Sequence, residues 1–176
     1  MTEAIDTREL RNALGCFATG VTIVTAQVPE ELRLPDTVDG SDNVGLTVNS
    51  FSSVSMEPPL ILWSLQRSSG ALDVFRAASH FAVNVLAADQ IELSNRFATT
   101  RDDKFDGVSF ERGAGGAPLL HGCVVCFECR LWDEYDGGDH VIFVGQVVAI
   151  QSSEGDALLF ERGRYAVAGA HPGLDD

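Results

Sequence analysis

The sequence GLTVNSFSSVSMEPP, at residues 45–59, carries many small polar side chains, although an apolar run follows it directly. Seven of these fifteen residues have a hydroxyl, amide or carboxylate group, yet the next four, residues 60–63, are all apolar. A segment that leads directly into a buried strand lies near the core itself, so its hydroxyls and amides need hydrogen-bond partners. In an extended chain neither face of this segment is purely polar.

Two interpretations of the polar segment remain open from its composition. Serine and asparagine are common in turns, so the segment is typical of a loop that lies in water. The same groups, together with free backbone amides, also suit a cradle around a flat, polar and phosphorylated ligand. Composition alone does not separate these two interpretations. We call residues 47–55 the cradle segment.

Length and charge narrow the classes of function. The 176 residues suffice for one domain with a full-sized core, and a hydrophobic content of 45% is typical of a globular protein. A formal net charge of −14 argues against nucleic acid and anionic membrane as partners. A phosphorylated ligand would have to be held by backbone amides, hydroxyls and a few cations, of which Arg67, Arg101 and the only lysine, Lys104, stand out.

The chain shows neither an obvious membrane span nor a secretion signal. No stretch approaches the ~20 apolar residues of a transmembrane helix. Residues 1–12 are charged and lack a hydrophobic signal region. We therefore expect a cytoplasmic protein, in which four cysteines do not form a disulfide framework.

The apolar pattern predicts a mainly β protein with short helices. A capping pattern at Asp6 and helical spacing predict a helix that runs to about Phe17. Helical spacing predicts a second helix over residues 71–78, and a capping pattern at Asp89 predicts a third that ends at Phe97. Apolar and β-branched runs predict strands at residues 21–26, 60–65, 81–86, 124–132 and 141–150, the last two joined by a hairpin across residues 133–139. This set favours a closed antiparallel barrel in a single domain (residues 1–176), and the chain has no Gly-x-Gly-x-x-Gly fingerprint of a doubly wound sheet.

Three further stretches are predicted from composition. Residues 28–43 hold two prolines and five acids, which predicts an acidic surface insertion; a lid or a partner-docking loop is the alternative. Residues 169–176 predict a flexible tail. The glycine-rich residues 113–116 lack the Gly-Lys-Ser/Thr ending of a phosphate loop, so we expect a plain turn there.

The spacing Cys123-x-x-Cys126-x-x-Cys129 resembles that of zinc or iron–sulfur ligands. The intervening residues contain no glycine or proline to make the turn that would bring three thiolates together. On a strand, Cys123 and Cys129 would share a face while Cys126 points to the other. We therefore predict small core residues and no metal site.

Several motifs together resemble one family along nearly the whole chain, from about residue 10 to residue 165. They are residues 45–60 with the cradle segment, FATGVTIVT at 17–25, FAVNVL at 81–86, Phe97-Ala98 followed by Lys104-Phe105, Pro118 to Leu120 with Glu128-Cys129, and GDHVIFVG at 138–145. This set resembles the flavin reductase family with the FMN-binding split barrel. Members of that family are the NAD(P)H-dependent components that supply reduced flavin to two-component monooxygenases.

The resemblance implies a closed antiparallel split β-barrel that forms a homodimer and reduces FMN or FAD with NADH or NADPH for a separate monooxygenase. Hydride would pass from the nicotinamide to the flavin, with the protein supplying stacking, orientation and hydrogen bonds. A non-catalytic flavin-binding module is the alternative, because it would share every cradle residue. The choice between the two nicotinamides, and between the two flavins, stays open.

The resemblance also assigns residues to the site. Flavin-binding roles fall to Thr47, Val48, Asn49, Ser50, Ser53, Val54, Ser55, Arg67, Ser69, Phe81 and Lys104. Nicotinamide-binding roles fall to Thr19, Gly20 and His140, and His140 carries the catalytic role of positioning the nicotinamide. The chain departs from the family at Ala71, where a threonine usually stands; this leaves Arg67 or Ser68 to replace the missing phosphate contact.

Overall fold

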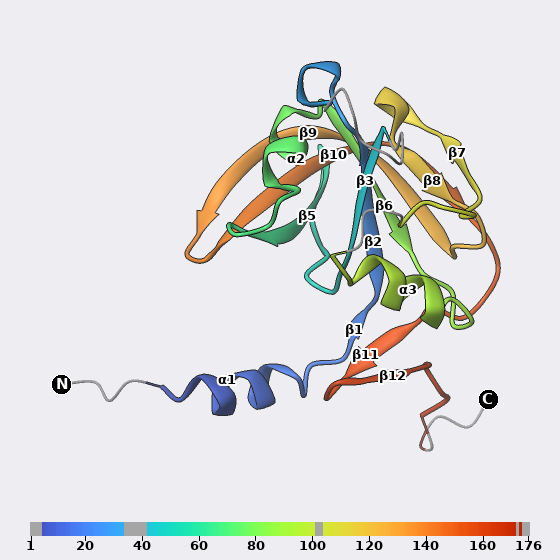
Figure 1. The fold of residues 1–176 in the computed structure, drawn as a ribbon. Helices are drawn as coiled ribbons and strands as arrows, with labels where there is room; N and C mark the ends of the chain where they lie inside the picture. Colours follow the sequence, from blue (N-terminus) through green and yellow to red (C-terminus); the bar gives the residue numbers. More distant parts are fainter. Residues whose placement is uncertain (1–4, 34–41, 101–103, 172, 174–176) are drawn as a thin grey trace.

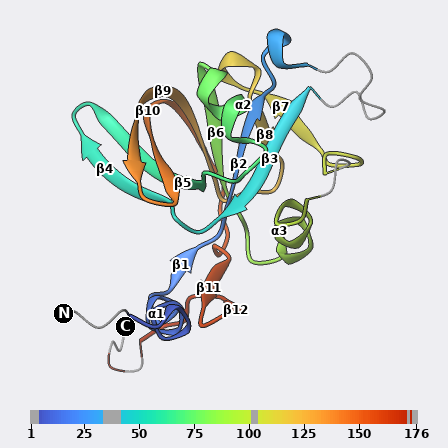
Figure 2. The same cartoon turned by 60° about the vertical axis from the view of Figure 1, so that its left-hand side comes forward.

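The computed structural model describes residues 5–33, 42–100, 104–171 and 173. Its largest element is a curved antiparallel sheet of seven strands (Figures 1 and 2). In spatial order the strands are β3 (Asn43–Val48), β2 (Thr22–Gln27), β6 (His80–Val85), β9 (Val125–Gly137), β10 (His140–Ser152), β5 (Pro59–Gln66) and β4 (Ser52–Met56). All the strands that sequence patterns predicted are present within this sheet.

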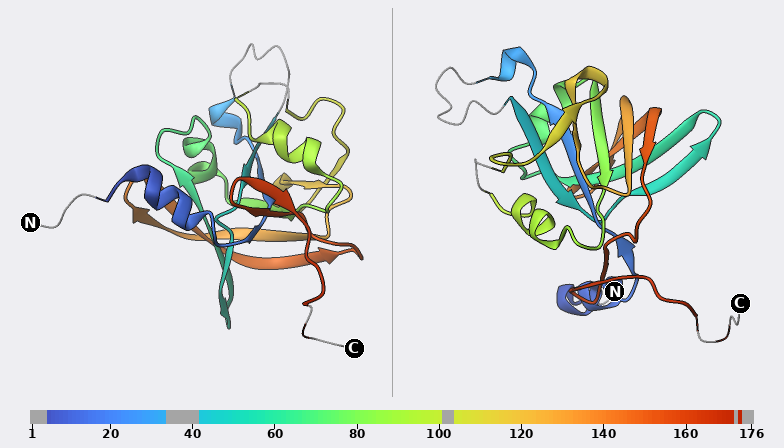
Figure 3. Two further views of the ribbon diagram at one scale, coloured as in Figure 1. Left: turned by 90° about the horizontal axis from the view of Figure 1, so that it is seen from below. Right: turned by 90° about the vertical axis from the view of Figure 1, so that its right-hand side faces the viewer.

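Smaller elements surround the main sheet. One small sheet joins β1 (Thr19–Gly20), β11 (Leu159–Glu161) and β12 (Arg164–Ala166), and another joins β7 (Phe110–Arg112) and β8 (Pro118–Leu120). The helices are α1 (Thr7–Leu14), α2 (Leu72–Ala77) and α3 (Ile91–Phe97), with 3-10 turns η1 (Glu30–Leu32) and η2 (Ala114–Gly116). Helix α1 and the β1–β11–β12 sheet lie to one side of the main sheet, as Figures 1 and 3 show.

The central strands β2 and β6 bury both of their faces, which explains why apolar residues predominate on both faces. Val24 and Val83 point into a core cluster built around Trp63, whereas Ile23 and Ala82 point into a second cluster with Phe97, Leu120 and Leu158. Successive side chains of a strand alternate between the two faces of the sheet, so a strand between two cores is mostly apolar. The buried polar residues of these strands, Thr22, Thr25 and Asn84, are hydrogen-bonded.

Strand β5 alternates more simply, because only one of its faces is fully buried. Ile61, Trp63 and Leu65 are 5%, 0% and 4% exposed. The Trp63 ring packs against Phe75 of α2 and stacks on Phe143 of β10, with both ring centroids 4.9 Å away. Leu72 and Phe75 are the buried residues of α2, as their helical spacing predicted.

The helices differ from prediction at their ends. The Asp6 carboxylate accepts a hydrogen bond of 2.8 Å from the Glu9 amide, which confirms the predicted cap of α1. However, α1 ends at Leu14 rather than near Phe17. The predicted capping role of Asp89 is wrong, since Gln90 is the N-cap of α3 and makes no side-chain cap bond.

The β9–β10 hairpin confirms the predicted pairing but is longer than expected. Residues 133–137 belong to β9 rather than to a loop, and Gly137 pairs with His140. The turn is therefore only Gly138 and Asp139. Gly138 has φ of +78°, a left-handed conformation that glycine adopts without steric cost.

The predicted insertion connects β2 to β3. Its two ends meet where the Val28 amide donates to the Asp42 carbonyl at 2.7 Å and Arg33 forms an ion pair with Asp42 at 3.4 Å. Residues 34–41 lie outside the described residues, as do residue 172 and residues 174–176 of the predicted tail. The insertion and tail therefore stay predictions, whereas the glycine-rich residues 113–116 form the expected turn around η2.

The cysteines are arranged differently from the prediction. Because β9 begins only at Val125, Cys123 lies before the strand, and it shares the second core cluster with Cys126. Cys129 lies in the Trp63 cluster, where burial raises the pKa of its thiol to about 12. The prediction that Cys123 and Cys129 share a face was wrong, but the three thiols still divide between two cores.

The observed pairings define an open series of strands. Within the described residues, β3 and β4 are the two edges of the main sheet. The structure confirms a mainly β, single-domain fold with three short helices. Closure of the barrel stays a prediction. No helix in the described part of the chain is both long and apolar enough to cross a membrane.

Candidate functional site

A cavity of about 1070 Å³ is lined by residues of β3, β5 and β10. Its wall combines most of β3, the end of β5, the loop before α2, the end of α3 with the residues that follow it, and the turn end of the β9–β10 hairpin. Seven of the predicted site residues line it: Thr47, Val48, Asn49, Ser50, Ser69, Lys104 and His140. They come from four separate parts of the sequence, so the fold brings together half of the fourteen residues that the resemblance assigned.

The other predicted residues lie outside this cavity. Ser53, Val54 and Ser55 belong to the edge strand β4, and Thr19 and Gly20 belong to β1. Phe81 is 1% exposed and packs against Trp63, with ring centroids 5.9 Å apart, so it is a core residue rather than a residue that flanks the cavity. Arg67 points toward the β9–β10 hairpin.

Hydroxyl groups at the end of β3 are held by neighbouring elements. The Thr47 hydroxyl donates to the Ser94 carbonyl of α3 at 2.7 Å. The Ser50 hydroxyl donates to the Ser64 carbonyl at 3.2 Å and accepts from the Ser64 amide at 2.9 Å. These bonds fix the chain on both sides of Asn49, whose exposed side chain lines the cavity. The polar residues of this strand end are therefore structural partners as well as cavity lining.

Lys104 supplies the positive charge in the cavity wall. Its ammonium donates to the carbonyls of Gly45 and Phe97 at 3.1 Å and 3.2 Å. Burial lowers the pKa of Lys104. Because an ammonium group has three donors, one N–H remains for a ligand oxygen.

Gly45 allows α3 to pack closely on β3 beside Lys104. A Cβ at this position would lie 2.5 Å from Cε1 of Phe97, a ring that is 1% exposed. We expect Gly45→Ala to lower the free energy of unfolding by about 1–3 kcal/mol, because the buried ring must shift. Thermal or urea unfolding measures this loss. Gly20→Ala is the matched control, since a Cβ there meets nothing within 4 Å; equal stability of the two variants would contradict the packing argument.

The loop before α2 presents Ser68, Ser69 and Gly70 to the cavity. The Ser69 hydroxyl accepts from the Ala71 amide at 3.3 Å, and Ala71 itself adds no hydroxyl. Of the two residues that could replace the missing contact, Ser68 lines the cavity and Arg67 does not.

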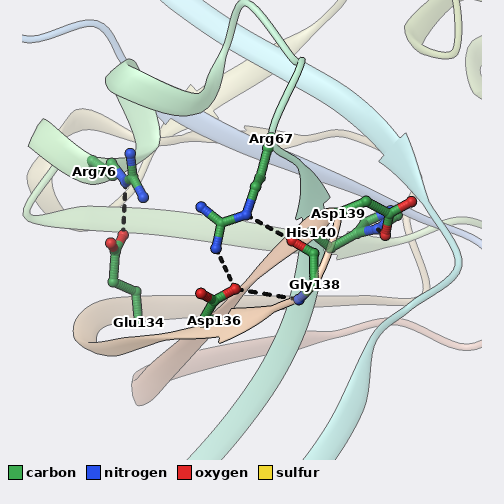
Figure 4. Close-up of polar contacts among 7 residues, drawn as sticks. All are labelled: Arg67, Arg76, Glu134, Asp136, Gly138, Asp139 and His140. Carbon is green, nitrogen blue, oxygen red and sulfur yellow. Dashed lines mark hydrogen bonds and ion pairs between the residues drawn. The ribbon is translucent and has the colours of Figure 1, made fainter.

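His140 lies at the start of β10, where it pairs with Gly137 of β9 and Gln66 of β5. Its Nδ1 is 2.7 Å from a carboxylate oxygen of Asp139. This hydrogen bond is the main reason why the pKa of Asp139 is lowered. With Nδ1 engaged, Nε2 is the ring nitrogen left for a ligand in the cavity. Figure 4 shows His140 and Asp139 at the end of the hairpin.

Several lining residues were missed by the sequence reasoning, among them Ser64, Gln66, Thr99, Thr100 and Ile142. Ser64 is the one polar residue in the apolar run at residues 60–65, which was an available signal. Nothing local distinguishes the others. Within the described residues, no group of three or more His, Cys, Asp or Glu side chains is arranged to hold a metal ion.

Comparison with known proteins places the chain in a family. Residues 14–169 match the model described as flavin reductase like domain, so the chain belongs to this family and the resemblance is confirmed. It is 44% identical over 160 residues to the FMN reductase (NADH) SmoA of Agrobacterium fabrum, covering 91% of this chain and 85% of that protein. It is 37% identical to the reductase subunit HsaB of a flavin-dependent monooxygenase from Rhodococcus jostii, covering 93% of this chain and 78% of that subunit.

A solved structure shows the same fold with ligands. The NADH:FAD oxidoreductase SgcE6 of Streptomyces globisporus, in complex with NAD and FAD fragments, superposes with a TM-score of 0.82. The two chains are 36% identical over 99% of this chain and 100% of that chain. Some other relatives are longer, and this chain spans about half of their length.

Proposed function

We propose that this protein oxidises NADH or NADPH, reduces FMN or FAD, and supplies the reduced flavin to a separate monooxygenase. One observation carries the proposal: a single cavity joins the polar end of β3 to His140 in a chain of the flavin reductase family. The relatives named for FMN or FAD reduction and for monooxygenase systems support the same reaction class. A cytoplasmic location stays a prediction.

The residues present fit a flavin. A volume of about 1070 Å³ lies just above the ~300–1,000 Å³ typical of small-molecule sites. When bound, a flavin supplies the hydride acceptor. Backbone groups of residues 47–50 and the Asn49 side chain would face its ring system, while Ser68, Ser69 and Lys104 would hold its phosphate. His140 would orient the nicotinamide through Nε2.

A homodimer is also part of the proposal. Helix α1 buries none of its residues, and Leu14 and Phe17 are 67% and 78% exposed. On β4, Val54 and Met56 are 49% and 90% exposed. Large apolar side chains exposed on these two segments suit a surface that a partner covers. A second copy that covers these segments would lie against β4 and near β1, and would so bring their predicted residues to an interface. Closure of the split barrel is part of the proposal as well.

The dimer is tested by light scattering on the purified protein at several concentrations. We expect twice the 18.9 kDa mass of the chain across the range. Phe17→Glu should shift the equilibrium toward the monomer, because it introduces a charge into an apolar interface. A matched change at a polar exposed site, Arg164→Glu, should not; a monomeric wild-type protein would contradict the proposal.

Lys104→Met tests the phosphate contact. Removing a half-buried ammonium should weaken FMN binding by roughly 3- to 10-fold, because one charge-assisted hydrogen bond is lost. Riboflavin has no phosphate, so its affinity should stay unchanged. Fluorescence quenching of each flavin measures both constants, and Arg164→Met serves as the control for loss of a positive charge. Equal weakening of both flavins would show that Lys104 holds the chain at Gly45 rather than the phosphate.

The reaction itself is tested by steady-state oxidation of NADH and NADPH with added FMN, FAD or riboflavin. The proposal expects turnover that depends on flavin.

A further inference from the structure

Next to the pairing of His140 with Gln66 of β5, Arg67 adds side-chain and backbone contacts to the turn before His140. The Arg67 amide donates to the Asp139 carbonyl at 2.9 Å, and the Arg67 Nε donates to the Gly138 carbonyl at 2.8 Å. The same guanidinium forms an ion pair with the Asp136 carboxylate. That carboxylate accepts in turn from the Gly138 amide at 3.2 Å. Figure 4 shows the contacts of the Arg67 guanidinium with Gly138 and Asp136, and that of Asp136 with Gly138, at the two-residue turn.

The geometry suits arginine and fixes the turn from both sides. A guanidinium is a planar fork, so it can donate to a carbonyl and a carboxylate at once, which a lysine ammonium cannot do with the same geometry. Asp136 and Gly138 are thereby held in one arrangement. Without the fork, the carbonyl of Gly138 and the carboxylate of Asp136 would lose their shared donor, and only the bond from the Gly138 amide to that carboxylate would remain between them.

The position of this turn sets the position of the imidazole. His140 follows Gly138 by two residues, and its ring is hydrogen-bonded to Asp139, the other residue of the turn. His140 lines the cavity, whereas the Arg67 side chain is not among the lining residues. A change in the turn would therefore move the imidazole, although Arg67 itself stays outside the cavity.

We propose that Arg67 is a positioning residue for His140: it holds the Gly138–Asp139 turn so that the imidazole faces the nicotinamide. The consequence for turnover rests on the proposed function, whereas the effect on the imidazole does not. This role replaces the expected contact of Arg67 with the flavin phosphate, because two nitrogens of its guanidinium are already bound to the hairpin.

A second arginine on the same side of the hairpin provides a matched control. The Arg76 Nε of α2 forms an ion pair with Glu134 at 3.0 Å. Arg67 and Arg76 are similarly exposed, with side chains 41% and 38% accessible. Both hold strand β9, but within the described contacts only Arg67 reaches the turn itself (Figure 4).

The experiment compares Arg67→Ala, Arg76→Ala, His140→Ala and the double variant Arg67→Ala/His140→Ala in the full chain. We expect Arg67→Ala to raise the KM for NADH by roughly 3- to 10-fold, since a displaced orienting group loses part of its effect. Arg76→Ala should leave the KM unchanged. The double variant should be no worse than His140→Ala, because Arg67 acts through His140. Affinity for FMN and for riboflavin should be unchanged in Arg67→Ala.

A second readout does not depend on activity. In spectra of isotope-labelled histidine, the His140→Ala variant assigns one of the four histidine rings. The His140 ring signals should shift or broaden in Arg67→Ala and stay in place in Arg76→Ala. Unchanged His140 signals in Arg67→Ala would overturn the proposal, even in a protein that turned out not to oxidise NADH.

The remaining outcomes separate the two proposals. Weaker binding of FMN but not of riboflavin in Arg67→Ala would return Arg67 to the phosphate and overturn the positioning role, as would additive losses in the double variant. Equal losses in Arg67→Ala and Arg76→Ala would show a general brace of the hairpin. A wild-type protein without NADH or NADPH oxidation contradicts the proposed function instead.

Discussion

His140→Ala is expected to lower kcat/KM for NADH or NADPH by roughly 5- to 150-fold, which corresponds to the 1–3 kcal/mol that a hydrogen-bonding group in a site contributes. The loss should fall mainly on the KM for the nicotinamide if His140 binds ground state and transition state alike. Flavin affinity should be spared, because His140 lines the cavity from the start of β10, whereas the proposed flavin contacts come from β3 and the loop before α2. Steady-state kinetics and flavin titration measure the two effects separately.

The matched control is His121→Ala. The His121 ring is hydrogen-bonded to the Ser109 hydroxyl at 2.8 Å and does not line the cavity. The variant His121→Ala should leave both the nicotinamide kinetics and the flavin affinity unchanged. Nicotinamide kinetics that are unaltered in His140→Ala would reduce His140 to a turn residue. A parallel collapse of flavin affinity would move it to the flavin side of the cavity.

Asn84→Ala should cause the largest loss of stability, about 2–4 kcal/mol in the free energy of unfolding. Asn84 is fully buried on β6. Its amide nitrogen donates to the Ile23 carbonyl at 3.0 Å and to the Thr25 hydroxyl at 3.1 Å. Its oxygen accepts from the Leu120 amide at 2.9 Å and from the Cys126 thiol at 3.2 Å. Alanine leaves each of these buried neighbours in place but removes its hydrogen-bond partner. This costs more than replacing both members of a hydrogen-bonded pair with apolar groups.

Urea unfolding measures the loss, and Asn95→Ala is the control. Asn95 is exposed and accepts a single hydrogen bond of 2.8 Å from the Tyr165 hydroxyl, so its removal should change stability by less than about 0.5 kcal/mol. Similar stability of the two variants would mean that water or a shifted side chain satisfies the groups around Asn84.

The sequence predicted the five most apolar strands and the three helices, because their signals are local, but it did not predict the edge strands β3 and β4 or the short strands of the two small sheets. The apolar run at residues 60–65 and the spacing of Leu72 and Phe75 each predicted an element that the structure contains. The ends of elements were less accurate. Residues 133–137 are polar and looked like a loop, but pairing with β10 extends β9 through them.

The candidate site was predictable only in part, since side-chain directions depend on distant pairing. The cradle segment leaves the cavity after Ser50 because β4 pairs with β5 at the edge of the sheet. Arg67 was expected near a phosphate, but its partner Asp136 is 69 residues away in the sequence. No local pattern predicts the structural role of Asn84, because its hydrogen-bond partners come from β2, β8 and β9.

The central claim is most directly tested by mixing the purified protein with FMN, FAD or riboflavin and an equal amount of NADH or NADPH without oxygen. The absorbance of at least one oxidised flavin should then disappear as the nicotinamide is oxidised, with two electrons transferred per flavin and at a rate proportional to the protein concentration. Binding of flavin without its reduction by either nicotinamide would contradict the account and identify a non-catalytic flavin-binding module.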